Sequence, residues 1–201
     1  YRQCAKTFDQ AKTQLKEALF HKPKRYVHTL GVVETAETLA HRYGEDPAQA
    51  RWAALLHDCA KGLSREETLS LCETYGVPFD EIMREEPELI HGPLGAVLAR
   101  ECYGMQDAAV LEAIACHTTG KRNMSLLDKI IYLADAIEPA RQYPGVDELR
   151  RTAMEDLDQA ILDSMGSTMQ FVLQRGGLLH PLTVDARNAL IIQLKQEQQT
   201  L

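Results

Sequence analysis

The stretch "LLHDCAKGL", residues 55–63, places a histidine and an aspartate side by side at the end of an apolar run. Leu55 and Leu56 precede His57 and Asp58, and a lysine and a glycine follow shortly after. An imidazole beside a carboxylate at this point either closes a helix in solvent or lines a site. The stretch alone fits both interpretations, so the residues before and after it must decide between them.

Apolar side chains recur at helical spacing along most of the chain, and strand patterns are weak. In the segment that ends at Gly44, helical spacing places Val27, Leu30, Val33 and Tyr43 on one broad face. We therefore expect a helix that buries these four side chains and stops at the glycine.

Residues typical of helix starts and helix ends mark the other predicted helices. Ser64 with Glu67, and Ser125 with Asp128, have the spacing of a capping box at a helix start. A single long helix is expected over 147–175, ended by a pair of glycines. The chain therefore predicts an all-α fold, a compact bundle of about eight to ten helices.

Composition narrows the class of protein. A chain of 201 residues with 45% hydrophobic residues can bury one compact core. Its formal net charge of −7 argues against a protein that coats DNA or RNA, which needs a basic surface. A local basic pocket could still hold the phosphates of a nucleotide. We expect no nucleic acid partner.

Cysteine usage and hydropathy indicate a compartment. No apolar stretch approaches the roughly 18 residues of a membrane span, and no signal peptide is recognisable. The cysteines are odd in number and lack CxxC spacing, so we expect reduced thiols rather than disulfides or a zinc site; they are Cys4, Cys59, Cys72, Cys102 and Cys116. We expect a cytoplasmic protein without a membrane partner, either a monomer or a homodimer.

Six imidazole and carboxylate side chains lie within or at the ends of the predicted helices, beside apolar residues: His28, His57, Asp58, His91, His117 and Asp135. A lone histidine in such a position is more often a hydrogen-bonded core residue than a ligand. Asp135, however, follows the apolar run "IIYLA", and a buried carboxylate needs a cationic partner. Neutral imidazoles with carboxylates suit a borderline divalent metal such as iron, manganese or zinc.

The order H…HD…H…H…D resembles the HD superfamily of metal-dependent phosphohydrolases, all-α domains whose metal is held by an H…HD…D pattern. Within it, the chain resembles the YqeK family through "RYVHTLGVVETAETLA", "AALLHDCAKG", "IHGPLGA", "IACHTTG", "KIIYLADAIEPAR" and "LLHPLTVDARNAL". Members of that family are symmetrical bis(5'-nucleosyl)-tetraphosphatases, which split diadenosine tetraphosphate into two ADP. The resemblance covers about residues 20–190. We expect an N-terminal helix packed on the domain (1–20), an HD domain (21–195) and a frayed polar tail (196–201).

The resemblance also implies a ligand set. The residues that would hold the metal are His28, His57, Asp58 and Asp135. The family implies iron, with manganese, cobalt, nickel or zinc as alternatives. His91 and His117 would either complete a second metal site or bind and protonate phosphate oxygens, and we favour one metal with both histidines facing the phosphates. Asp58, His91 and His117 are the expected catalytic residues. Asp58, or alternatively Asp135, could orient the attacking water as a general base, and the two histidines could protonate phosphate oxygens.

Nucleotide contacts are expected around this centre. Lys61 and Arg141 could bind phosphate, although the first could instead be a helix-end lysine and the second a surface arginine. The loop that follows the predicted long helix lines the nucleotide pocket in the family, but a helix end and a turn would also explain its glycines. The full set of expected contacts is His28, Asp58, Lys61, His91, His117, Thr118, Asp135, Arg141, Gly176, Gly177, Leu178, Leu179, His180 and Pro181.

Two other functions fit the same motifs. One is a different HD phosphohydrolase activity, on a nucleoside triphosphate, a mononucleotide or a guanosine alarmone. The other is a metal- and nucleotide-sensing module without significant turnover. The presence of all six candidate ligands favours an enzyme, since a binding module does not need a complete metal site.

Overall fold

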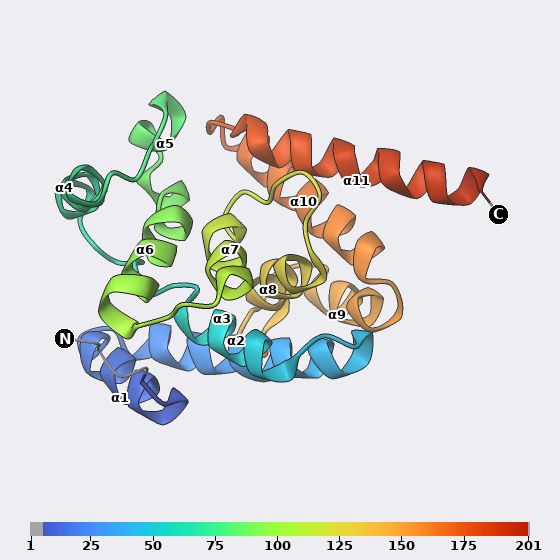
Figure 1. Cartoon of the computed structure of the whole chain (residues 1–201). Helices are drawn as coiled ribbons and strands as arrows, with labels where there is room; N and C mark the ends of the chain where they lie inside the picture. The colour runs from blue at the N-terminus through green and yellow to red at the C-terminus, as the bar shows by residue number, and fades with distance from the viewer. Residues whose placement is uncertain (1–5, 201) are drawn as a thin grey trace.

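The computed structural model describes residues 6–200, and in this part of the chain every regular element is a helix (Figure 1). The elements are α1 Phe8–Ala18, α2 Pro23–Tyr43, α3 Pro47–Leu56, α4 Arg65–Tyr75, α5 Glu81–Glu85, the 3-10 helix η1 Pro87–Leu89, α6 His91–Tyr103, α7 Ala108–Cys116, α8 Leu126–Ile137, α9 Val146–Glu155, α10 Leu157–Gln174 and α11 Pro181–Gln199. The predicted all-α class is confirmed, with eleven α-helices among the described residues.

The single long helix expected over 147–175 is wrong. Asp156 interrupts it with an extended backbone (φ −144°, ψ 102°) and separates α9 from α10. Its side chain accepts a hydrogen bond from the Gln159 backbone N–H at 3.0 Å, so it acts as the N-cap of α10. Both predicted capping boxes are present, at Ser64 before α4 and at Ser125 before α8.

The core lies where α2 packs against α3 and α8, with α7 packed between α6 and α8. The predicted core face of α2 is wrong at Val27, whose surface is 59% exposed. The helix instead buries Ala36 and Ala40 together with Thr29, Val32 and Leu39. Because α3 presents Ala50, Ala53 and Ala54, small side chains on both helices let the two backbones approach closely.

A second, smaller core joins α4, α5 and α6 around Cys72, Met83 and Leu94. Leu56 belongs to the main core and Ala60 to the smaller one. The turn that carries the His57–Asp58 pair therefore bridges the two cores and is fixed from both sides.

The two ends of the chain differ. α1 packs on the main core through Ala11 and Leu15, and so does Leu19, the residue that caps its C-terminus. α11 projects beyond the other helices (Figure 1) and stays helical through Gln199, so most of the predicted frayed tail is helix. Residues 1–5, which include Cys4, and residue 201 lie outside the described part of the chain.

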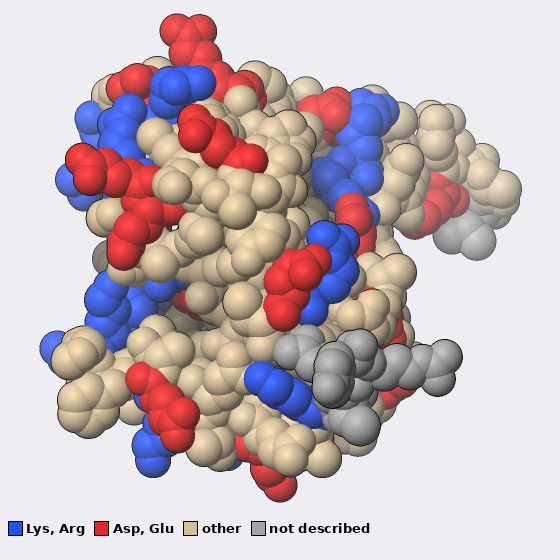
Figure 2. Space-filling view, turned by 60° about the vertical axis from the view of Figure 1, so that its left-hand side comes forward, with Lys and Arg blue, Asp and Glu red and all other residues tan. Residues whose placement is uncertain are grey.

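Surface charge of both signs is interspersed on the face drawn in Figure 2, without a continuous basic area there. Among residues 6–200, no helix is both long enough and apolar enough to cross a bilayer.

Candidate metal centre

Five helices bring the six predicted ligands together. α2 carries His28 one turn from its start, the turn after α3 carries His57 and Asp58, and α6 begins at His91. The other two ligands come from the end of α7 and from α8, and they are His117 and Asp135. Residues that are up to 107 positions apart in sequence thus converge on one point because their helices pack on the same core.

Four of the side chains surround one position. His28 Nε2 lies 3.1 Å from Asp135 Oδ1 and 3.6 Å from Asp58 Oδ2. His57 Nε2 lies 3.8 Å and 3.5 Å from the same two oxygens. Two imidazoles and two carboxylates therefore face one another at spacings that a shared cation would bridge.

The other oxygen of Asp58 faces a second pair of histidines. Oδ1 lies 3.1 Å from His91 Nε2 and 3.5 Å from His117 Nε2, and these two nitrogens are 3.1 Å apart. Asp58, which is almost fully buried, thus stands between two groups of histidines and contacts each with a different oxygen.

Two of the imidazoles are oriented by their own helices. The Nδ1–H of His57 donates to the Ala54 carbonyl at 2.6 Å, and that of His117 donates to the Ile114 carbonyl at 2.6 Å. A carbonyl can only accept, so Nδ1 carries the proton of each neutral ring and Nε2 is the atom left to face the centre and bind a cation there. This is the arrangement that a metal-binding histidine requires.

The sequence interpretation missed Glu138, which orients His28. Its Oε1 lies 3.0 Å from His28 Nδ1, its Oε2 accepts from the Ala140 N–H at 2.7 Å, and the residue is only 2% exposed. The carboxylate occupies space that a side chain at position 31 would need, since a Cβ on Gly31 would lie 2.5 Å from Oε2. An acid three residues after Asp135, next to a proline, was the available signal.

The electrostatics of the centre favour a cation. Burial lowers the pKa of His57, but Asp58 and Asp135 outweigh it and raise this pKa to about 9. Burial raises the pKa of both aspartates, but the surrounding imidazoles bring each pKa well below its usual range. Within residues 6–200, His28 Nε2, His57 Nε2 and Asp58 Oδ1 are buried without a hydrogen-bond partner. These imidazole and carboxylate donors indicate a divalent metal ion.

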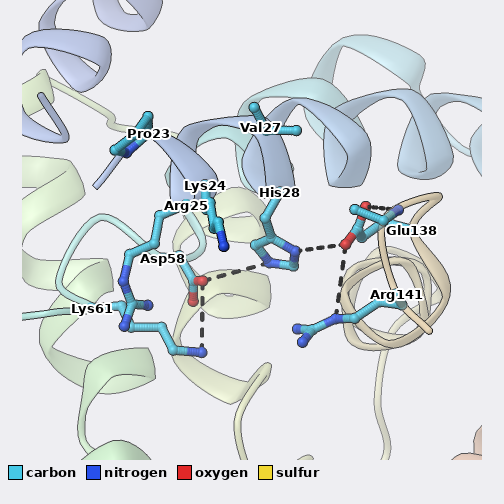
Figure 3. A pocket seen from close by; sticks show the side chains of 10 residues that line it. Pro23, Lys24, Arg25, Val27, His28, Asp58, Lys61, Glu138 and Arg141 are labelled. Atoms are coloured by element: carbon cyan, nitrogen blue, oxygen red, sulfur yellow. Dashed lines mark hydrogen bonds and ion pairs between the residues drawn. The ribbon is translucent and has the colours of Figure 1, made fainter. Parts of the chain in front are cut away.

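A cavity of about 520 Å³ opens onto the centre (Figure 3). Of the predicted nucleotide contacts, His28, Asp58, Lys61 and Arg141 line it. Lys61 Nζ lies 3.8 Å from Asp58 Oδ2, and Arg141 Nη2 lies 2.8 Å from Asp135 Oδ1. Both cationic side chains therefore face the cavity from beside a candidate metal ligand.

The other predicted contacts lie elsewhere. Thr118 Oγ1 donates to the Leu89 carbonyl at 3.0 Å and joins the end of α7 to η1. His180 caps α11 and places its Nε2 2.8 Å from Asp80 Oδ2, at the start of α5. The remaining loop residues, which do not line the cavity, are Gly176, Gly177, Leu178, Leu179 and Pro181. Their contact with a nucleotide stays a prediction.

Comparison with known proteins agrees with this geometry. The sequence model of the HD domain family matches residues 25–140, a range that contains all six candidate ligands. A symmetrical bis(5'-nucleosyl)-tetraphosphatase from Halalkalibacterium halodurans is 44% identical over 171 residues, 85% of this chain and 91% of that protein. The Bacillus subtilis protein of the same name is 42% identical over 167 residues, 83% of this chain and 89% of its own.

A solved structure supports the fold. It is described as a predicted HD superfamily hydrolase involved in NAD metabolism from Clostridium acetobutylicum, and it is 46% identical in sequence. The two structures superpose with a TM-score of 0.90, over 94% of this chain and 98% of the other.

Proposed function

Because this chain belongs to the HD-domain family of symmetrical bis(5'-nucleosyl)-tetraphosphatases, we propose that it hydrolyses diadenosine tetraphosphate between the two central phosphates and releases two ADP. The observation that carries this proposal is a buried imidazole and carboxylate cluster that opens onto a cavity with cationic side chains. The cluster suits a divalent cation, and the cationic walls suit a polyphosphate.

The metal would be held by His28, His57, Asp58 and Asp135. When bound there, a divalent cation lowers the pKa of a water molecule and offsets negative charge on the phosphoryl oxygens. We infer iron, because the resemblance to the YqeK family implies it, with manganese, cobalt, nickel and zinc as alternatives that the same imidazole and carboxylate donors suit. One ion per chain is favoured, since the second histidine pair shares a single carboxylate oxygen.

Side chains of the protein would supply the proton transfer and the phosphate contacts. Asp58 Oδ1 lies beside the second histidine pair rather than the first, so it is placed to take a proton from the attacking water. His91 and His117 present their Nε2 atoms to the same region. His91, whose Nδ1 makes no hydrogen bond within residues 6–200, would donate from Nε2 to a phosphoryl oxygen, and His117 would do so once its Nε2 is protonated. Lys61 and Arg141 form ion pairs with Asp58 and Asp135, respectively. A cation bound by those two carboxylates would weaken both ion pairs, and Lys61 and Arg141 would then contact phosphate.

The reaction is tested by separating the products of diadenosine tetraphosphate. We expect two ADP per substrate; AMP with ATP would contradict symmetrical cleavage. A panel with ATP and guanosine tetraphosphate tests the other HD activities. Asp58→Asn should abolish turnover, whereas Asp163→Asn, on an exposed helix surface, should retain it.

The metal is tested by elemental analysis of the purified protein. We expect one iron per chain. Two metal ions per chain, with loss of one in His91→Ala, would overturn the single-ion arrangement.

A further inference from the structure

The first turn of α2 places two cationic side chains, Lys24 and Arg25, on the wall of the cavity at the metal centre. This turn contains no acidic residue, and the helix has no side-chain cap. Among the lysines and arginines that line the cavity within residues 6–200, Lys61 and Arg141 form ion pairs, and neither Lys24 nor Arg25 has one. Cations at the positive end of a helix dipole are unfavourable, so an anion in the cavity would stabilise this arrangement.

Arg25 is half-buried beside the turn that carries Lys61. A Cβ on Gly62 would lie 3.5 Å from Arg25 Nε and 2.5 Å from Lys22 Nζ, and Gly62 has a φ of +93°. Lys22 Nζ also donates to the Gly62 carbonyl, which ties the start of α2 to this turn. A larger residue at position 62 would therefore be strained and would push the basic side chains apart.

The cavity has cationic groups on opposite sides. Figure 3 shows Arg25 and Lys61 on one side and Arg141 on the other, with His28 and Asp58 between them. A divalent cation at the centre would neutralise the carboxylates that now pair with Lys61 and Arg141. Positive charge in the cavity would then exceed negative charge. A chain of phosphates that spans both sides would balance it, since each phosphate carries a negative charge.

We propose that Lys24 and Arg25 form an outer phosphate site, which holds the half of diadenosine tetraphosphate that lies beyond the scissile bond from Arg141. This inference rests on the proposed function. Val27 lies on the same wall with 59% of its surface exposed and gives the departing nucleoside an apolar contact. The outer site adds affinity only for ligands whose phosphate chain extends past the bond that is cleaved.

Calorimetry tests the outer site on the metal-loaded protein with two ligands. One is ADP, and the other is a diadenosine tetraphosphate analogue with a methylene group between the central phosphates, which cannot be cleaved there. We expect Lys24→Ala to weaken binding of the analogue about threefold and Arg25→Ala about tenfold, because the arginine is less exposed. ADP can bind at the metal centre and, more weakly, at the outer site. Its affinity for the metal centre should stay within about twofold of the wild-type value in both variants.

Matched controls are Lys195→Ala and Arg151→Ala, which remove exposed cationic side chains outside the cavity. Arg25→Lys should recover part of the lost affinity because it keeps the charge. Analogue binding by the Lys24→Ala, Arg25→Ala double variant equal to that of the controls would overturn the outer site. Equal losses for ADP and for the analogue would also overturn it.

Different results would contradict the outer site and the proposed function. A wild-type protein that releases no ADP from diadenosine tetraphosphate contradicts the proposed function, whatever the variants bind. A wild-type protein that releases ADP, with unchanged analogue affinity in the double variant, contradicts only the outer site. Metal content of each variant, measured in parallel, identifies any change that arises from the centre itself.

Discussion

Glu138→Gln should weaken metal binding although Glu138 is not itself a proposed ligand. Both carboxylate oxygens of Glu138 are in use: Oε1 lies 3.0 Å from His28 Nδ1, and Oε2 accepts from the Ala140 N–H at 2.7 Å. Glutamine has the same shape but only one acceptor oxygen, so its amide group must face one of these two N–H donors. The substitution also removes the negative charge that makes the imidazole a stronger donor.

The magnitude follows from these contacts. Loss of a carboxylate behind a metal-binding histidine costs about 10- to 100-fold in metal affinity, which is roughly 1.4–2.8 kcal/mol. The substitution should also lower folding stability by about 1–3 kcal/mol. Glu138 is only 2% exposed, so the donor that loses its acceptor is buried away from water. Both effects should therefore appear in one variant, measured independently.

The assay titrates a metal-free protein against a chelating indicator and follows unfolding in urea in parallel. Glu34→Gln is the matched control, since Glu34 is an exposed acid on the same helix as His28. Loss of stability with unchanged metal affinity would refute the positioning role, because it would mean that Glu138 only fills space. A gain in metal affinity would refute it as well.

The remaining predictions concern the same centre and the fold around it. Gly31→Ala should lower metal affinity as Glu138→Gln does, because its Cβ would displace the carboxylate, and the double variant should be less than additive in the same titration. Asp156→Ala should cost about 1 kcal/mol of folding stability in urea by removing the cap of α10, and an unchanged unfolding midpoint would contradict that role. Chelation of the metal should lower the melting temperature, and added metal should restore it, since only the folded chain assembles the ligands.

The six candidate ligands could be identified in the sequence because their order resembles that of the HD superfamily, and one of them also stands out by its own surroundings. A carboxylate such as Asp135 after an apolar run needs a cation wherever the helices pack, so its partner could be expected without knowledge of the packing. The capping boxes were predictable for a similar reason, since they depend on residues three positions apart.

Features set by packing between distant segments were not predictable. The buried face of α2 depends on the alanines of α3, and its pattern alone wrongly favoured Val27. Glu138 resembles a solvated acid at a helix end until α2 brings His28 and Gly31 against it. The break at Asp156 was missed because the apolar spacing continues across it in sequence.

Two histidines at helix ends, His57 and His117, owe their orientation to local sequence. His57 and His117 each follow the last residue of a helix, and each donates its Nδ1–H to the carbonyl three residues earlier. The orientation of the ring is therefore set by its own helix, and the partner helix needs only to bring the Nε2 atoms together. Because the turn at Asp58 is fixed by both cores, a single carboxylate can contact both groups of histidines. The positions of these Nε2 atoms therefore depend on the residues that end α3 and α7.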